Sequence, residues 1–282
     1  MLVGATTLEF KRFGEERYTK MREFGFQAVD YSIGDTELPE YTLSDNELEA
    51  FIVSEKKKIE DAGLIISQVH GPWRWPCQDN TEEDRAERME KMKRSIKICA
   101  LLGCKHWVIH PIMPYGTYEK KDAEKAKLTY DMNIKFMSQL LEFAKAHNVI
   151  ICLENMPMPD FSLGSPQDTL RFVKEMNDDN FKICFDTGHA TMFGYKSVGE
   201  HVRELGDYIK VFHIHDNNGW ADIHQLPYFG VIDWGDFSKA LKDIDFKGIF
   251  SLETPSCPNM CDEDYEKLNR MKFDMAQRVI NL

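Results

Sequence analysis

The sequence contains no long hydrophobic run. None of its apolar stretches approaches the roughly 20 residues that a membrane-spanning helix needs. The N-terminal stretch MLVGATTLEF also lacks the basic region and long apolar core of a secretory signal. The hydrophobic share of 43% and the charged share of 29% are those of a globular protein. We therefore expect a soluble protein that acts in the cytoplasm and does not bind membranes.

Net positive charge is also missing, since the formal net charge is −12. An acidic surface does not attract the phosphates of nucleic acid, so we expect a small molecule as the partner and do not expect nucleic acid. The seven cysteines are odd in number and show no framework spacing. Cys99, Cys152 and Cys184 lie in apolar runs and are predicted to be buried free thiols. A homo-oligomer is compatible with the sequence, because dimers are the commonest assembly.

Three widespread catalytic motifs are absent. No Gly-x-Gly-x-x-Gly follows the first strand and no Walker A sequence occurs, which argues against an open nucleotide-binding sheet. The Gly-x-Ser-x-Gly turn of serine hydrolases is missing as well. Neither low-complexity segments nor breaks in composition divide the chain. We therefore expect one domain over residues 1–282.

Short apolar runs alternate with helical patterns along the whole chain. Eight such runs are predicted as strands, at residues 2–6, 26–32, 64–70, 106–111, 149–155, 182–186, 208–216 and 249–253. A helical pattern follows each run, and the first of these βα units is the least regular. The count and the length of 282 residues suit a closed parallel barrel, which typically needs about 250 residues. The predicted fold is an α/β protein of the (β/α)₈ TIM barrel type.

The apolar runs end in residues that bind metals. These are His70, His110, Glu154, Asp186, His213 and Glu253, with His189 one turn after Asp186 and Asp222-Ile-His224 in a later loop. Barrel strands deliver their C-terminal residues to one face, where several carboxylates would repel one another without a cation. Imidazole and carboxylate ligands without thiolate suit zinc, manganese, iron or cobalt. Taken singly, each residue could instead be an ordinary polar residue at the end of a strand that faces water and binds no metal.

Together these residues resemble the xylose-isomerase-like barrel superfamily, which includes sugar isomerases and epimerases and the endonuclease IV type of abasic-site nuclease. The resemblance to the ketose 3-epimerase branch implies one metal held by Glu154, Asp186, His213 and Glu253. It also implies that His189 contacts the substrate. Two features depart from that branch: Asp160 stands where it has a second Glu, and HIHDNNGW lacks its Arg.

The resemblance to the nuclease branch implies three zinc ions and nine ligands. All nine occur in order: His70, His110, Glu154, Asp186, His189, His213, Asp222, His224 and Glu253. The stretch QLPYFGVIDW after His224 differs from the Gly-rich acidic segment of the nucleases. It is more similar to isomerase-like members of the superfamily. The cofactor is therefore expected to be a divalent metal, zinc or manganese, with one to three ions bound.

The leading hypothesis is a metal-dependent isomerase or epimerase of a sugar, sugar phosphate or polyol. Glu154 and Glu253 would transfer a proton through an enediolate while the metal acts as a Lewis acid, and His189 would hold a substrate oxygen. Further substrate contacts are predicted at Trp73, Arg74, Trp220 and His215. The alternative is a zinc-dependent phosphodiesterase of abasic sites. A sugar-binding barrel without catalysis is a third hypothesis, against which the pair of glutamates argues.

Overall fold

Eight parallel strands form the inner wall of the molecule. The computed structural model describes residues 1–73 and 79–282. Within them the strand order is β7-β6-β5-β4-β3-β2-β1-β8. The strands are β1 Leu2–Thr6, β2 Ala28–Ser32, β3 Ile65–His70, β4 His106–Ile109, β5 Ile150–Glu154, β6 Phe181–Asp186, β7 Ile209–His213 and β8 Ile249–Leu252. The backbone of Ile214 joins the two ends of this order, by hydrogen bonds to Ser251 O at 2.8 Å and from Glu253 N at 3.0 Å. The predicted (β/α)₈ TIM barrel is confirmed.

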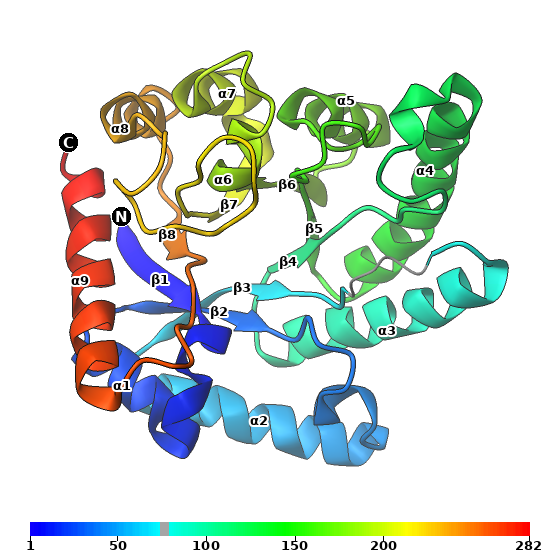
Figure 1. Ribbon diagram of the computed structural model, residues 1–282. Coiled ribbons are helices and arrows are strands. Elements are labelled where there is room, and N and C mark those ends of the chain that lie inside the picture. Colours follow the sequence, from blue (N-terminus) through cyan, green and yellow to red (C-terminus); the bar gives the residue numbers. More distant parts are fainter. Residues whose placement is uncertain (74–78) are drawn as a thin grey trace.

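The α-helices surround these strands (Figure 1). They are α1 Arg17–Glu23, α2 Asp45–Asp61, α3 Glu82–Leu101, α4 Ala123–Ala146, α5 Pro166–Met176, α6 Thr187–Thr191, α7 Val198–Leu205, α8 Trp234–Asp243 and α9 Asp262–Ile280. Their ends follow local sequence signals. For example, the Ser165 hydroxyl accepts a hydrogen bond from Asp168 N at 3.1 Å and caps α5 just before Pro166. Among the described residues, no helix is both long and apolar enough to cross a membrane.

The first βα unit is the irregular one. A 3₁₀ segment, η1 Thr7–Glu16, precedes the short helix α1. Gly14 interrupts η1 with a φ of +52°, a left-handed conformation that glycine adopts without steric cost. Further 3₁₀ turns are η2 Pro39–Tyr41, η3 Glu119–Lys121 and η4 Gly206–Tyr208. The interruption explains why this unit shows no clear helical period in the sequence.

The two faces of the strands carry different clusters. The large core between strands and helices includes Ile109, Leu153, Phe185 and Phe212. On the other face a small apolar cluster joins four strands and consists of Val108, Cys152, Cys184 and Val211. Each of these four residues lies two positions before a predicted metal ligand, and residues two apart on a strand share a face. The small cluster therefore forms an apolar floor directly beneath the predicted site.

The prediction for the cysteines is confirmed. Cys99, Cys152 and Cys184 are all buried and free. Burial raises the pKa of the Cys152 and Cys184 thiols well above the ordinary value. Without a bound metal these groups are therefore neutral thiols packed among apolar side chains.

Candidate metal centre

The predicted ligands meet at one rim of the barrel. His70, Glu154, Asp186 and His213 are the last residues of β3, β5, β6 and β7, while His110 and Glu253 directly follow β4 and β8. A cavity of about 400 Å³ opens over them. Its lining includes His70, His110, Glu154, His189, Asp222, His224 and Glu253. The carboxyl ends of the strands thus build the site, as is usual for a barrel of this kind.

The ligand atoms fall into three principal groups, in each of which they lie within 4.8 Å of one another. The outer group is His70, His110 and Glu154; the central group is Glu154, Asp186, His213 and Glu253; the loop group is His189, His215, Asp222 and His224. The outer and central groups share Glu154. The structure thus brings together all nine residues predicted as ligands and adds His215 to them.

His213 shows why the central group fits a cation. Its Nε2 lies 3.1 Å from Oδ2 of Asp30, so Nε2 is the protonated nitrogen that donates to this carboxylate. The other nitrogen, Nδ1, lies 3.1 Å from Glu154 Oε1 and 3.2 Å from Glu253 Oε2. Nδ1 of His213 and Oε2 of Glu154 are buried without a hydrogen-bond partner. Burial would lower the pKa of His213, but the carboxylates around it help to raise this pKa well above its ordinary value, so without a cation Nδ1 carries a proton. A divalent cation between Nδ1 and the two carboxylates would take the place of that proton.

Four further imidazoles are held in the orientation that metal ligands adopt. Their Nδ1 atoms lie near backbone carbonyl oxygens: His70 near Gly71 at 2.9 Å, His189 near Asn155 at 2.8 Å, His215 near Asp216 at 3.2 Å and His224 near Glu253 at 3.1 Å. A carbonyl oxygen only accepts, so Nδ1 must carry the proton. The Nε2 atoms are then left to face the carboxylates of the site. Histidines that bind metals are commonly fixed by such a bond from the other ring nitrogen.

The carboxylates and imidazoles of the site shift one another's pKa values. Burial alone would raise the pKa of Glu154, but His213 and His110 hold it well below the ordinary value. Burial would lower the pKa of His189 and His224, but the carboxylates around them raise these pKa values to about 10 and about 9. Without a bound cation, imidazolium groups therefore supply the positive charge that the carboxylates require. A bound cation would replace that charge and release the protons.

The donor set of the site indicates the class of metal. Cys184 lies next to Glu154 and His213, so one buried thiol is also within reach of the site. The remaining donors are imidazoles and carboxylates. This combination suits zinc, manganese, iron or cobalt rather than the metals that select thiolate sites.

The residues predicted as substrate contacts take different places. Trp73 lines the cavity, and its ring centroid lies 5.9 Å from that of His110. Trp220 is 77% exposed and is not part of the cavity lining. His215 is fully buried, and its Nε2 lies 3.0 Å from Asp186. Both ring nitrogens of His189 face protein atoms, because its Nε2 lies 3.3 Å from Asp222. Arg74 lies outside the described residues.

The sequence did not single out several residues that shape this site. Asp30 is buried on β2, and Gln68 donates a hydrogen bond to its Oδ2 at 3.0 Å. An acidic residue inside the apolar run FQAVDYS was the available signal for Asp30. Arg88 lines the cavity from α3 and donates to Asp79 at 2.6 Å. Its position depends on the packing of α3 against the barrel and has no local sequence signal.

Comparison with known proteins places the chain in a family. Residues 18–271 match the family model described as "xylose isomerase-like TIM barrel". An uncharacterised protein of Methanocaldococcus jannaschii is 35% identical over 125 residues, which are 44% of this chain and 43% of that protein. The chain thus spans less than half of that relative. D-psicose 3-epimerase of Ruminiclostridium cellulolyticum is 25% identical over 83% of this chain and 75% of its own length.

Two other matches are a relative with a different description and a solved structure. The probable endonuclease 4 of Mycoplasmopsis agalactiae is 29% identical over 58% of this chain and 61% of that protein. Among solved structures, D-psicose 3-epimerase from Clostridium cellulolyticum H10 superposes with a TM-score of 0.78 at 19% identity, covering 99% of both chains. At this identity the superposition supports the fold alone.

Proposed function

Since the chain belongs to the xylose isomerase-like TIM barrel family, we propose that it is an isomerase or epimerase of a sugar or polyol derivative that depends on a divalent metal. The proposal agrees with the description of one relative as D-psicose 3-epimerase. It also agrees with the description of another as inosose isomerase, which is 24% identical over 61% of this chain and 62% of that protein.

One observation carries the proposal. The carboxylates of Glu154 and Glu253 converge on Nδ1 of His213, at 3.1 and 3.2 Å, at the base of the cavity. They reach this point from β5 and from the end of β8. Isomerisation or epimerisation next to a carbonyl requires one group that removes a proton and one that returns it. Two carboxylates that meet in one cavity supply such a pair.

The chain's own residues would act as follows. Glu154, Asp186, His213 and Glu253 would hold the metal, which when bound acts as a Lewis acid on the substrate oxygens and acidifies the adjacent C–H. One of the two glutamates, as a carboxylate, would take the proton through its free oxygen, and the other, entering the step protonated, would donate its own proton to the resulting enediolate; exchange with solvent then restores both groups. The side chain of Glu253 is 23% exposed while Glu154 is almost fully buried. We therefore propose that Glu253 is the glutamate that is more accessible to a substrate in the cavity.

The size and lining of the cavity indicate the size and charge of the substrate. Its volume of about 400 Å³ lies within the range of roughly 300–1,000 Å³ found for small-molecule sites. Part of its wall is apolar and is formed by Pro111, Met113, Met156, Pro157 and Met158. In the described lining, the one Lys or Arg is Arg88, which is already paired with Asp79. These features favour an uncharged substrate such as a ketose or polyol over a phosphorylated one.

The test is conversion of a panel of ketoses and polyols by protein loaded with zinc, manganese or cobalt. We expect one metal to support formation of an epimer or isomer, detected by chromatography. Glu253→Gln should lower kcat by about 10²- to 10⁴-fold, the usual contribution of a general acid or base. Glu263→Gln, an exposed change on α9, is the matched control. Equal activity of Glu253→Gln and the unchanged protein would refute the assignment.

Abasic-site phosphodiesterase is the second candidate. The specific observation in its favour is the grouping of nine predicted ligands around three positions, two of which share Glu154. The net charge of −12 argues against it, because the substrate would be a polyanion. Incubation of the zinc-loaded protein with a duplex that carries one abasic site tests it. Cleavage at that site that is lost in Glu154→Gln would favour this candidate.

A further inference from the structure

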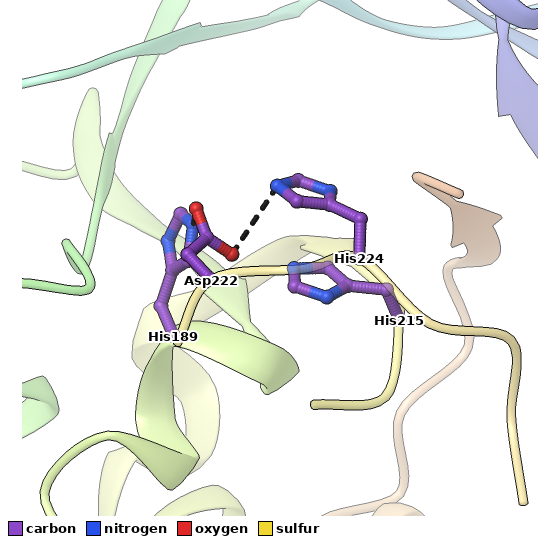
Figure 2. A group of neighbouring side chains, drawn as sticks. All are labelled: His189, His215, Asp222 and His224. Carbon is purple, nitrogen blue, oxygen red and sulfur yellow. Dashed lines mark ion pairs between the residues drawn. The ribbon is translucent and has the colours of Figure 1, made fainter. Parts of the chain in front are cut away.

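The cavity above the metal centre has two unlike sides. Its polar side carries metal-binding residues, and Figure 2 shows part of it, with the carboxylate of Asp222 between the rings of His189 and His224. The other side is an apolar wall, which consists of Pro111, Met113, Met156, Pro157 and Met158. We propose that the substrate is a sugar derivative with an apolar substituent, such as an aromatic ring, and that the apolar wall binds this substituent. The inference rests on the proposed function and narrows its substrate class.

The apolar wall lies across the cavity from one of the two catalytic glutamates. Pro111 and Met113 follow β4, and the other three residues of the wall follow the neighbouring strand β5. Glu253 follows β8, and β8 lies opposite β4 in a closed ring of eight strands in this order. A substrate whose reacting carbon lies at Glu253 can therefore extend across the cavity until its far end contacts the apolar wall.

The backbone of the wall has few hydrogen-bond donors to offer. Pro111 and Pro157 have no N–H group. The N–H groups of Met113 and Met156 donate to other protein oxygens, at 2.8 and 2.9 Å. Four of the five wall residues therefore use or lack the donor that a substrate hydroxyl group would need.

The one Lys or Arg in the described lining is also engaged. Arg88 donates from one terminal nitrogen to Asp79 at 2.6 Å and from the other to the carbonyl oxygen of His110 at 3.4 Å. A plain ketose carries a hydroxyl group on every carbon except the carbonyl carbon. Hydroxyl groups that leave water for the apolar wall lose hydrogen bonds, which is unfavourable. An apolar group gains free energy from burial at the same place.

The residues of the wall suit a substituent larger than a methyl group. They come from two loops, so a methyl group could contact few of them at once. Met113 and Met156 are almost fully buried, while Met158 is half-buried. Trp73 follows β3, the other neighbour of β4, and lines the same cavity with 45% of its surface exposed. Methionine is flexible and polarizable and packs favourably against aromatic rings. An aromatic substituent therefore fits this side of the cavity.

The test compares substituted and free sugars. Each ketohexose of a panel is used as the free sugar and as its 6-O-benzyl ether, in which the apolar group is far from the carbonyl carbon. Calorimetric titration of the metal-loaded protein gives Kd, and deuterium incorporation in D₂O gives the rate of proton transfer. Met158→Gln makes the wall more polar at similar volume, whereas Met158→Leu keeps it apolar. Met271→Gln, a 39% exposed change on α9, is the matched control.

We expect the benzyl ether of at least one ketohexose to bind at least about 10-fold more tightly than the free sugar, as a small apolar contact typically provides. Met158→Gln should reduce this preference by about 10-fold. Met158→Leu and Met271→Gln should retain it, because neither makes the wall polar.

Two results would overturn this inference and leave the proposed function intact. One is proton transfer with free ketoses whose benzyl ethers bind no more tightly. The other is a preference for the ethers that is as large in Met158→Gln as in the unchanged protein. Failure of every sugar, free or substituted, to exchange deuterium would instead overturn the proposed function on which the inference rests.

Discussion

Asp30 and His213 are joined across the interior of the barrel. Oδ2 of Asp30 lies 3.1 Å from Nε2 of His213, although β2 and β7 are not neighbours in the sheet. Both side chains are buried. The contact fixes the proton of His213 on Nε2 and turns Nδ1 towards Glu154 and Glu253. Asp30 is thus a positioning residue for the central group.

Asp30→Asn is expected to weaken binding of the central cation by about 10- to 100-fold, as loss of such outer partners typically does. The neutral amide would support the imidazole less well as a donor to the metal. Zinc or manganese titration of the metal-free protein measures the effect. Asp35→Asn, an exposed change shortly after β2, is the control. Unchanged affinity in Asp30→Asn would show that His213 is oriented without Asp30.

Removal of bound metal is expected to lower the melting temperature. A cation at 100 Kd stabilises the native state by about 2.7 kcal/mol, because it binds the folded site alone. For a domain of this size, this energy corresponds to roughly 5–10 °C. Thermal unfolding with chelator, and again after zinc is restored, measures the change. Equal melting temperatures in the two conditions would argue against a metal site.

The buried pair of Glu9 and Lys272 is expected to support the segment that follows β8. Lys272 Nζ lies 2.5 Å from Glu9 Oε2, and Glu9 Oε1 accepts a hydrogen bond from Thr254 N at 2.8 Å, next to Glu253. Lys272→Met should lower the free energy of unfolding by about 3–5 kcal/mol, since it leaves a buried carboxylate unpaired. Urea unfolding measures this loss.

Two variants test the cause of that destabilisation. The exposed Lys267→Met on the same helix should cost less than about 1 kcal/mol. The double variant Glu9→Gln/Lys272→Met should lose less than the sum of its single variants, because no charge is left unpaired. Strict additivity would mean that the two side chains act independently.

His201 is expected to contribute to the loss of stability in acid. Burial lowers its pKa to about 4, whereas an unfolded histidine titrates near 6.5. Between these values the unfolded chain binds a proton that the native protein does not, so stability falls as the pH falls from 6.5 towards 4. From pH 7.5 to pH 5 this single group accounts for about 2 kcal/mol. His201→Gln should reduce the difference in unfolding free energy between these pH values by that amount.

The control for this prediction is His147→Gln, at the half-buried C-terminal end of α4. It should leave the difference between the two pH values close to that of the unchanged protein. Urea unfolding at pH 5 and 7.5 gives all the values. The same pH dependence in His201→Gln as in the unchanged protein would contradict the assignment.

Much of the fold could be predicted because the strands of a parallel barrel are buried on both faces. Runs such as residues 149–155 and 249–253 are therefore nearly continuous in apolar residues, and their ends point to the site. The helical pattern after the last run also corresponds to a helix, α9 Asp262–Ile280. The segment η1 was not, because its 3₁₀ turns and the break at Gly14 leave no regular period.

The parts of the site that the sequence could not predict depend on contacts between distant residues. Asp30 acquires its role only when β2 and β7 face each other across the barrel. The stacking of His215 on His224 requires the bridge between Asp216 and Gln225, which spacing along the chain does not reveal. Trp220 could be predicted as an aromatic residue near the rim, but not its 77% exposure.

The most direct test of the proposed reaction is hydrogen exchange between substrate and solvent. The metal-loaded protein is incubated with each ketose of the panel in D₂O, and deuterium at the carbon next to the carbonyl is measured by NMR. We predict incorporation at one carbon of at least one sugar, and its loss in Glu154→Gln and Glu253→Gln. Epimer or isomer formed without any deuterium, or incorporation that persists in both variants, would contradict proton transfer by this pair of glutamates.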